Sequence, residues 1–182
     1  MFLRLQQQAQ VLAGEGDSVP DYRQSINDRI PPSGPAIPLN PGRLSPVGSS
    51  SPLAFTVLRA LSSVPQGGSA ITQDDMHCLD EAVRMALENG SLVTVSGRKM
   101  GGDEVLFGRA GLLWAILNLR MHHLSGSTSN SLHPGSDVVS RLLDVIIAAG
   151  RQGSEDYTKQ NGTNDSLPLM YVWMEGYYGF GA

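Results

Sequence analysis

Residues that commonly carry chemistry are scarce in this sequence, which has one cysteine and four histidines in 182 residues. Structural zinc needs four protein ligands and catalytic zinc about three, so Cys78 alone can form neither a cysteine-rich zinc site nor an internal disulfide. A nucleophilic thiol is the alternative. Cys78 lies beside Met76 and Leu79 on a predicted helix, and this position favours a packed, unreactive thiol.

The histidines do not form a metal-binding pattern either. His122 and His123 are adjacent, so on a helix their side chains diverge by about 100° and cannot both face one ion. His77 adjoins Cys78 with the same geometry, and His133 precedes a proline at a predicted helix start. We therefore predict no catalytic residue and no metal ligand in this chain.

Two pairs of neighbouring acidic residues are the remaining candidates for acid–base chemistry. Asp74 and Asp75 stand at a predicted helix start, where the helix dipole favours negative charge, and Asp103 and Glu104 stand in a predicted loop. A glycosidase needs two carboxylates about 5 to 9.5 Å apart across a cleft, and sequence spacing does not establish that separation. We interpret both pairs as helix-start and loop charges.

Composition excludes several classes of partner. Thirteen Lys and Arg stand against seventeen Asp and Glu, a net charge of −4, so no nucleic-acid surface is predicted. The N-terminal "MFLRLQQQAQVLAG" is interrupted by Arg4 and by glutamines, and the chain has no apolar run of the roughly 20 residues that a membrane span needs. We predict a cytoplasmic protein without a transmembrane segment, in which the sequons at Asn89, Asn161 and Asn164 are chance matches.

Most of the eleven prolines lie at or before Pro52, in a stretch rich in Gly and Ser. This composition disfavours helices and sheets, so residues 1–50 are predicted to be a largely disordered arm. A helical domain is predicted over residues 51–182. Its first helix begins at the N-cap Ser51 with Pro52 at the first helical position, and ends near Pro65.

The second helix is predicted from local capping signals. Thr72 is an N-cap with Asp75 in the third helical position, an acidic form of the capping box. Gly90 is predicted to end this helix in the left-handed conformation. The residues from Leu92 to Val95 resemble a short strand, but because no partner strand is visible we predict a loop.

Two further helices differ in how their apolar residues are distributed. The stretch "GGDEVLFGRAGLLWAILNLR" (residues 101–120) contains a helix predicted to open at Gly108 and Gly111. The apolar residues between Ala110 and Leu119 point in every direction around it, so this helix is predicted to be surrounded by protein. "SDVVSRLLDVIIAAG" is apolar on one face and is predicted to end at Gly150, before a polar loop. Buried and one-sided helices together predict an all-α fold with an inner and an outer layer of helices.

Two segments resemble the lanthionine synthetase C-like (LanC-like) family. "EVLFGRAGLLWAILNLR" is similar to the family's second glycine-rich repeat, and "LPLMYVWMEGYYGFGA" is similar to its segment of the form PLMYEW followed by two tyrosines and a glycine-rich turn. The resemblance covers about residues 76–182. The residues that match the motifs are Gly108, Arg109, Gly111, Pro168, Leu169, Met170, Tyr171, Trp173, Tyr177 and Tyr178.

The resemblance implies a fold as well as a family. It implies an (α/α) toroid whose inner helices begin at glycine-containing repeats, here a partial toroid over residues 51–182. Gly108 and Gly111 lie on one helix face. Each costs a helix about 1 kcal/mol relative to alanine, and close approach of a neighbouring backbone would offset that cost.

The activity that the resemblance implies is zinc-dependent addition of a thiol, from cysteine or glutathione, to dehydroamino acids in peptides or proteins. The family holds its zinc with two cysteines and a histidine, and the metal lowers the pKa of the attacking thiol. Cys78 matches none of these positions. We therefore expect that the sequence stops at Ala182 before the zinc site, and that this chain holds no cofactor and is inactive alone. A longer form would bind zinc, a peptide or protein substrate, and glutathione.

Two other functions remain open. One is a helical binding or scaffold module without chemistry, and the other, based on fold analogy alone, is a carbohydrate-active (α/α) barrel. The C-terminal aromatic residues fit a stacked ligand, but packing between helix layers is favoured for them. These residues are Tyr171, Trp173, Tyr177 and Tyr178.

Overall fold

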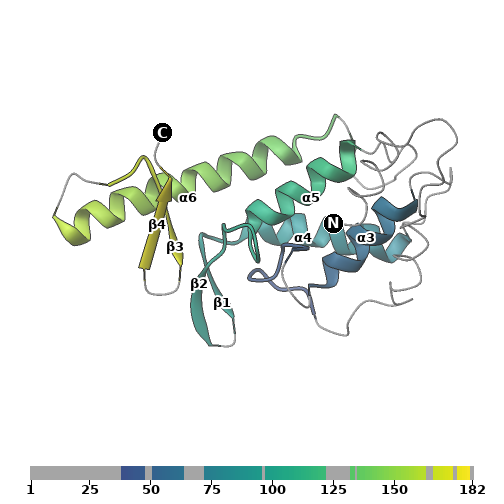
Figure 1. Cartoon of the computed structure of the whole chain (residues 1–182), viewed down its shortest axis with the longest axis horizontal. Coiled ribbons are helices and arrows are strands. Elements are labelled where there is room, and N and C mark those ends of the chain that lie inside the picture. Colours follow the sequence, from purple (N-terminus) through teal and green to yellow (C-terminus); the bar gives the residue numbers. More distant parts are fainter. Residues whose placement is uncertain are drawn as a thin grey trace, which may run out of the picture.

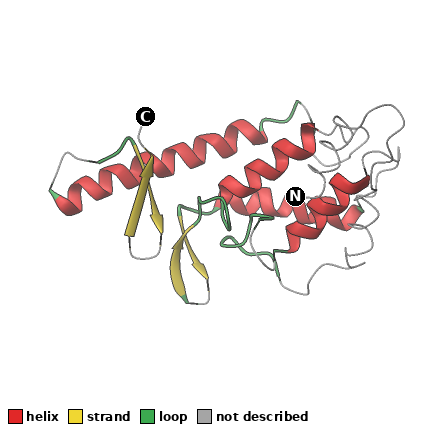
Figure 2. Ribbon diagram, viewed as in Figure 1, coloured by secondary structure: helices red, strands yellow, loops and turns green. Residues whose placement is uncertain are grey.

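The computed structural model describes residues 38–47, 51–63, 72–95, 97–121, 132–133, 135–162, 166–173 and 176–180. These residues form the helices α3 (Pro52–Ser63), α4 (Gln73–Glu88), α5 (Arg109–Met121) and α6 (Val138–Asn161). They also form two antiparallel hairpins, β1 (Leu92–Val95) with β2 (Arg98–Gly101) and β3 (Leu169–Trp173) with β4 (Gly176–Phe180). The described chain is mostly helical, as predicted, but the two hairpins make it not purely α (Figures 1 and 2).

The longest helix, α6, has 24 residues and extends for about 36 Å. In Figure 1, α3, α4 and α5 gather near its N-terminal end, whereas the β3–β4 hairpin crosses its C-terminal half. The β1–β2 hairpin lies between these two groups, where β2 contacts β3. Both hairpins therefore meet beside the start of α5.

The starts of the first two helices follow local sequence signals. α3 begins at Pro52, as predicted. The Ser51 hydroxyl donates to the backbone oxygen of Arg43 at 3.5 Å, a long contact that ties the start of α3 to the preceding segment. α4 has the predicted capping box: the Asp75 amide donates to the Thr72 hydroxyl, and the Asp75 carboxylate accepts from the Thr72 amide.

The predicted end of the second helix and the loop after it are both wrong. α4 ends at Glu88, and its C-cap Asn89 is extended, with φ −94° and ψ 151°. Gly90 does not have a positive φ; in the described residues only Gly97 and Gly162 do. The residues predicted as a loop form β1, because the chain turns back at Gly97 and the very next residues supply the partner strand β2.

The last helix is longer than predicted. α6 continues through Gly150 and ends at Asn161, where Gly162 adopts the left-handed conformation at φ 64° and donates to the Thr158 carbonyl. Gly150 is a contact residue instead of a stop, because the ring of Tyr171 lies against it. The polar stretch after Gly150 is therefore mostly helix, and the aromatic end forms a hairpin that the sequence did not predict.

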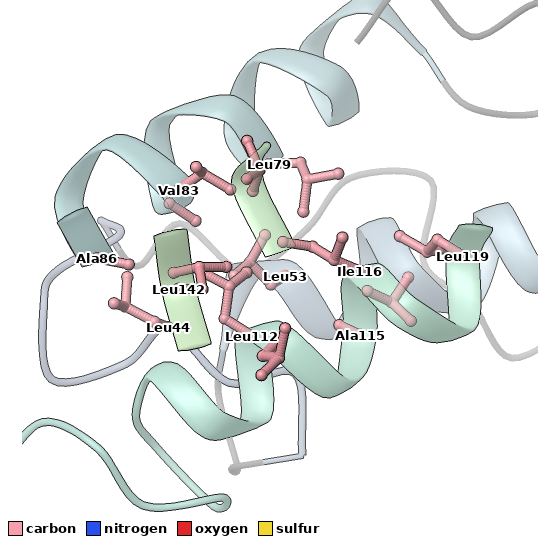
Figure 3. Close-up of a cluster of buried hydrophobic side chains, with 14 of the residues drawn as sticks. Leu44, Leu53, Leu79, Val83, Ala86, Leu112, Ala115, Ile116, Leu119 and Leu142 are labelled. Atoms are coloured by element: carbon pink, nitrogen blue, oxygen red, sulfur yellow. The ribbon is translucent and has the colours of Figure 1, made fainter. Parts of the chain in front are cut away.

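A single cluster of buried apolar side chains joins the four helices (Figure 3). Its largest fully buried members are Leu44, Leu53, Leu79, Leu112, Ile116, Leu119 and Leu142. Leu44 belongs to residues 38–47, which were expected to be part of the disordered arm and instead pack on the helices. The proline-rich composition did not show that this short stretch places a leucine in the core.

α5 is buried on one side only. Leu112, Ala115, Ile116 and Leu119 lie in the core, but Trp114 is 45% exposed, Leu117 42% and Met121 73%. These three residues recur at helical spacing, so they form one row, here called the α5 exposed row. The prediction that protein surrounds this helix on every side is therefore wrong for the described residues.

A buried polar contact joins α3 to α4. Asp75 is 3% exposed, forms an ion pair with Arg59 and accepts from the Thr56 hydroxyl at 3.0 Å. Burial alone would raise the pKa of Asp75, but hydrogen bonds from Arg59, Thr72 and Thr56 outweigh it and lower the pKa below its ordinary value. The folded state thus stabilises the charged form.

This contact predicts a specific loss of stability in acid. Because the pKa of Asp75 is lower in the folded chain, its contribution is complete above the unfolded pKa of about 3.9 and is lost as pH falls through the folded pKa. We expect Asp75→Asn to lower the free energy of unfolding by about 2 kcal/mol at neutral pH. The difference between variant and parent should shrink below about pH 4. Urea unfolding across this range measures it, and a difference that stays constant with pH would contradict the assignment.

Candidate functional site

The first LanC-like segment places a buried arginine at the start of α5. Arg109 is 4% exposed, and its Nε donates to the carboxylate of Asp103, which is itself buried. Its Nη1 also lies 3.4 Å from the Ala86 oxygen and 3.3 Å from the Asn89 oxygen. These carbonyls belong to the end of α4, where oxygen atoms lack helical partners and a positive charge is favourable. Arg109 therefore caps α4 while it begins α5.

The two motif glycines allow the predicted close approach, but α5 begins at Arg109 and Gly108 precedes it, so the prediction that both glycines lie on one helix face is wrong. A Cβ added to Gly108 would lie 2.4 Å from the Gly102 oxygen, and one added to Gly111 would lie 2.0 Å from Ser45 Oγ. The Val105 oxygen would be 2.2 Å from that same added atom at Gly111. Real Cβ atoms do not approach other atoms this closely, so no larger residue fits without movement of the backbone.

The loop before α5 is held by several hydrogen bonds. The Ser45 hydroxyl donates to the Val105 oxygen at 2.6 Å, and the Leu44 amide donates to the Phe107 oxygen at 2.8 Å. The Glu104 carboxylate accepts from the amides of Leu106 and Phe107. Residues 44 and 45 thus fix the loop on which Asp103 stands.

The second LanC-like segment packs against two glycines of α6. A Cβ added to Gly153 would lie 1.9 Å from the Met170 oxygen, and one added to Gly150 would lie 2.7 Å from Tyr171 Cζ. Met170 and Tyr171 are both buried. The hairpin therefore packs directly on the α6 backbone, at two positions where any side chain would clash.

The other motif residues of this segment are placed by the strands. Pro168 precedes β3, Leu169 begins it and Trp173 ends it. Tyr177 and Tyr178 lie in β4, and Tyr178 pairs with Tyr171. Tyr171 is buried, but it packs on α6 from a hairpin and not between two layers of helices. The side chains of Trp173, Tyr177 and Tyr178 lie outside the described part of the structure.

The two segments, about 60 residues apart in sequence, influence each other electrostatically, because the charges of Asp103 and Arg109 act on Tyr171. Burial raises the pKa of Tyr171, and the negative charge of Asp103 raises it further, whereas Arg109 partly lowers it. Burial also raises the pKa of Asp103, and the hydrogen bond and charge of Arg109 offset this only in part. We call Asp103, Arg109 and Tyr171 the junction triad.

The junction triad holds charge and fixes geometry, and its single carboxylate is already paired with Arg109. Among the described residues no three His, Cys, Asp or Glu side chains come together. His77 is exposed on α4, and His133 Nδ1 accepts a hydrogen bond from the Gly135 amide at 3.1 Å. His122 and His123 lie outside the described residues. The two residues of each acidic pair have different environments. Asp75 and Asp103 are buried and paired with arginines. Asp74 is exposed, and Glu104 accepts from backbone amides.

Cys78 is partly buried on α4. Burial raises the pKa of its thiol and the charge of Asp75 adds to this, against smaller opposing effects of Thr56 and Arg59. Because the thiolate is the reactive form, we expect iodoacetamide to alkylate Cys78 several-fold more slowly in the folded chain than in urea. Mass spectrometry of timed samples measures this, and equal rates would contradict a packed thiol.

One open groove lies between α4 and α6. It has a volume of about 310 Å³, an apolar floor and a charged rim. The floor is formed by Val83, Leu87 and Val138, and the rim by Asp80, Arg84, Glu88 and Arg141. Arg84 already pairs with Glu81 and Glu88, so the rim carries little free charge.

No family model, no characterised protein and no solved structure matches this chain. None of the described helices is long and apolar enough to cross a membrane. The resemblance to the LanC-like family therefore rests on the two quoted segments alone.

Sequence reasoning missed two residues of this site. Asp103 was interpreted as a loop charge, although it stands six residues before Arg109, a separation that one turn and the start of a helix can close. Ser45 was assigned to the arm, and no local signal connects it to Gly111, 66 residues later.

Proposed function

We propose that this chain is part of a LanC-like protein that adds thiols to dehydroamino acids in peptides or proteins. The observation that supports the proposal is that β3 of the second segment contacts β2 just before the first segment, and that the charges of the buried Asp103–Arg109 pair act on Tyr171. A chance resemblance in two short segments gives no reason for their buried residues to influence each other.

The proposed fold is a partial (α/α) toroid with α5 as an inner helix. Two features of α5 support this. Gly111 in its first turn and Gly108 just before it accept close neighbours, and its exposed row of Trp114, Leu117 and Met121 is apolar on the side away from the core. An inner helix has neighbours on both sides, so both sides of its sequence are apolar.

The zinc that the family uses does not fit the residues of this chain. Its set of two cysteines and a histidine cannot come from a sequence with one cysteine, and Cys78 is half-buried with no group of metal ligands around it in the described residues. We therefore derive no catalytic step from these residues. In the proposal they form a framework, and the zinc ligands come from a further segment of the same polypeptide.

The experiment joins transcript sequencing with metal analysis. We expect the reading frame to continue beyond the Ala182 codon into an Ala-His-Gly motif and then a Cys and a Cys-His motif. The longer protein should hold one zinc ion and the 182-residue chain only traces. A stop codon directly after Ala182, a continuation without these motifs, or stoichiometric zinc in the 182-residue chain would overturn the proposal.

A non-catalytic helical binding module is the second candidate, and the α5 exposed row favours it. Three large apolar side chains are exposed in one row of the described structure. Such a row is typical of a surface that binds a partner. No observation favours the carbohydrate-active barrel.

A further inference from the structure

Two Asn-Gly pairs occur in this chain, and each follows the last turn of a helix. Asn89–Gly90 follows α4, and Asn161–Gly162 stands at the end of α6. All four residues are exposed. The two side-chain amides are held alike: Asn89 Nδ2 donates to the Met85 oxygen at 2.8 Å, and Asn161 Nδ2 donates to the Tyr157 oxygen at 2.9 Å.

Asn-Gly pairs can undergo a spontaneous reaction that needs only water. The backbone nitrogen of the glycine loses its proton to base and attacks the asparagine Cγ, a C–N bond forms, and the side-chain nitrogen leaves as ammonia. Water then opens the resulting succinimide ring, which yields either aspartate or isoaspartate. Glycine favours the attack because it has no side chain to hinder the approach.

The two pairs differ in what holds the attacking nitrogen. The Gly162 amide donates to the Thr158 oxygen at 2.9 Å, as the left-handed cap of α6. Its attack would require the last turn of the helix to open. The Gly90 amide has no hydrogen-bond acceptor among the described residues, and an added Cβ there would meet no atom within 4 Å.

We propose that Asn89 is a site of spontaneous deamidation and isoaspartate formation, and that the helix cap protects Asn161 from the same reaction. The consequence reaches the junction triad, because the Asn89 backbone oxygen lies 3.3 Å from Arg109 Nη1. In isoaspartate the main chain runs through the former side chain, which inserts a methylene group, and the former Asn89 backbone carbonyl becomes a free carboxylate. The new carboxylate also adds negative charge at the C-terminal end of α4, where the helix dipole disfavours it.

The test follows both sites in the full chain at mildly alkaline pH and 37 °C, by peptide mapping with mass spectrometry and isoaspartate-specific enzymatic methylation. We expect Asn89 to react at least about ten times faster than Asn161 in the folded chain. In concentrated urea the two rates should become nearly equal, because neither glycine amide is then held. Equal rates in the folded chain, or a faster reaction at Asn161, would overturn the proposal.

A matched variant separates the chemistry from local unfolding. Gly90→Ala adds a methyl group in open space at a residue without positive φ, so the fold should be kept while the attack on Asn89 is hindered. We expect the rate at Asn89 to fall severalfold and the rate at Asn161 to stay unchanged. An unchanged rate at Asn89 would show that the Gly90 amide is not the attacking group and would overturn the assignment.

Discussion

Replacement of Asp103 by alanine is expected to lower the free energy of unfolding by about 3–5 kcal/mol, because it leaves the Arg109 guanidinium buried without its carboxylate. Asp103 and Arg109 side chains are 3% and 5% exposed, so water cannot replace the lost partner. The two carbonyls near Nη1 do not compensate, since their contacts of 3.3 and 3.4 Å are long. Urea unfolding monitored by circular dichroism measures the loss.

A second variant and a double variant serve as controls for this expectation. Asp103→Asn keeps an oxygen that can accept from Arg109 and should cost less than alanine. Asp103→Leu combined with Arg109→Met removes both charges, and we expect it to be more stable than Asp103→Leu alone. If the double variant were the less stable of the two, the ion pair could not be the reason for the loss.

Replacement of Gly111 by alanine is the second large expected effect, with a loss of about 3 kcal/mol. The added Cβ would lie 2.0 Å from Ser45 Oγ and 2.2 Å from the Val105 oxygen. The Val105 oxygen belongs to the backbone of the loop that carries Asp103, so a side-chain rotation cannot relieve the clash. The gain in helix propensity, about 1 kcal/mol, is smaller than this cost.

The control for Gly111→Ala is Gly90→Ala, where an added Cβ meets no atom within 4 Å. That substitution should change the free energy of unfolding by less than about 1 kcal/mol. Equal effects at the two positions would contradict the role of Gly111 as a contact residue. Calorimetry of both variants under the same conditions decides between these outcomes.

Local signals predicted the parts of the fold that depend on neighbouring residues. The N-terminal boundaries of α3 and α4 followed from Pro52 and from the Thr72–Asp75 capping box. Glycines were harder to interpret, because glycine is favoured both at the C-terminal end of a helix and where another segment approaches the backbone closely. Gly150 was taken for a stop although Tyr171 lies against it, and the real stop is Gly162.

Tertiary contacts explain what the sequence did not predict. The β1–β2 hairpin has only four residues in each strand, too few for an alternating pattern to stand out. For the site, the motif identified Gly108 and Gly111, at which the structure shows the predicted close contacts. The motif also contains Arg109, whose burial was not predicted. The sequence did not predict that Asp103 pairs with Arg109, because the burial of Asp103 depends on segments far apart in sequence.

The sequence of α5 is apolar on two sides, but it did not show which side faces the core of this chain. Leu112 and Ile116 face the core, whereas Trp114 and Leu117 are each more than two-fifths exposed. Hydrophobicity indicates that a surface is suited to burial but does not say which partner covers it. In the proposed toroid that partner is a neighbouring helix.

The central proposal is that this chain is part of a LanC-like protein that adds thiols to dehydroamino acids. The most direct measurement incubates the protein encoded by the complete reading frame with glutathione and a dehydroalanine-containing peptide, and follows the adduct by mass spectrometry with and without a zinc chelator. The account predicts adduct formation well above the uncatalysed rate, its loss with the chelator, and its return when zinc is restored. Adduct formation no faster than the uncatalysed reaction, or unchanged by removal of zinc, would contradict the account.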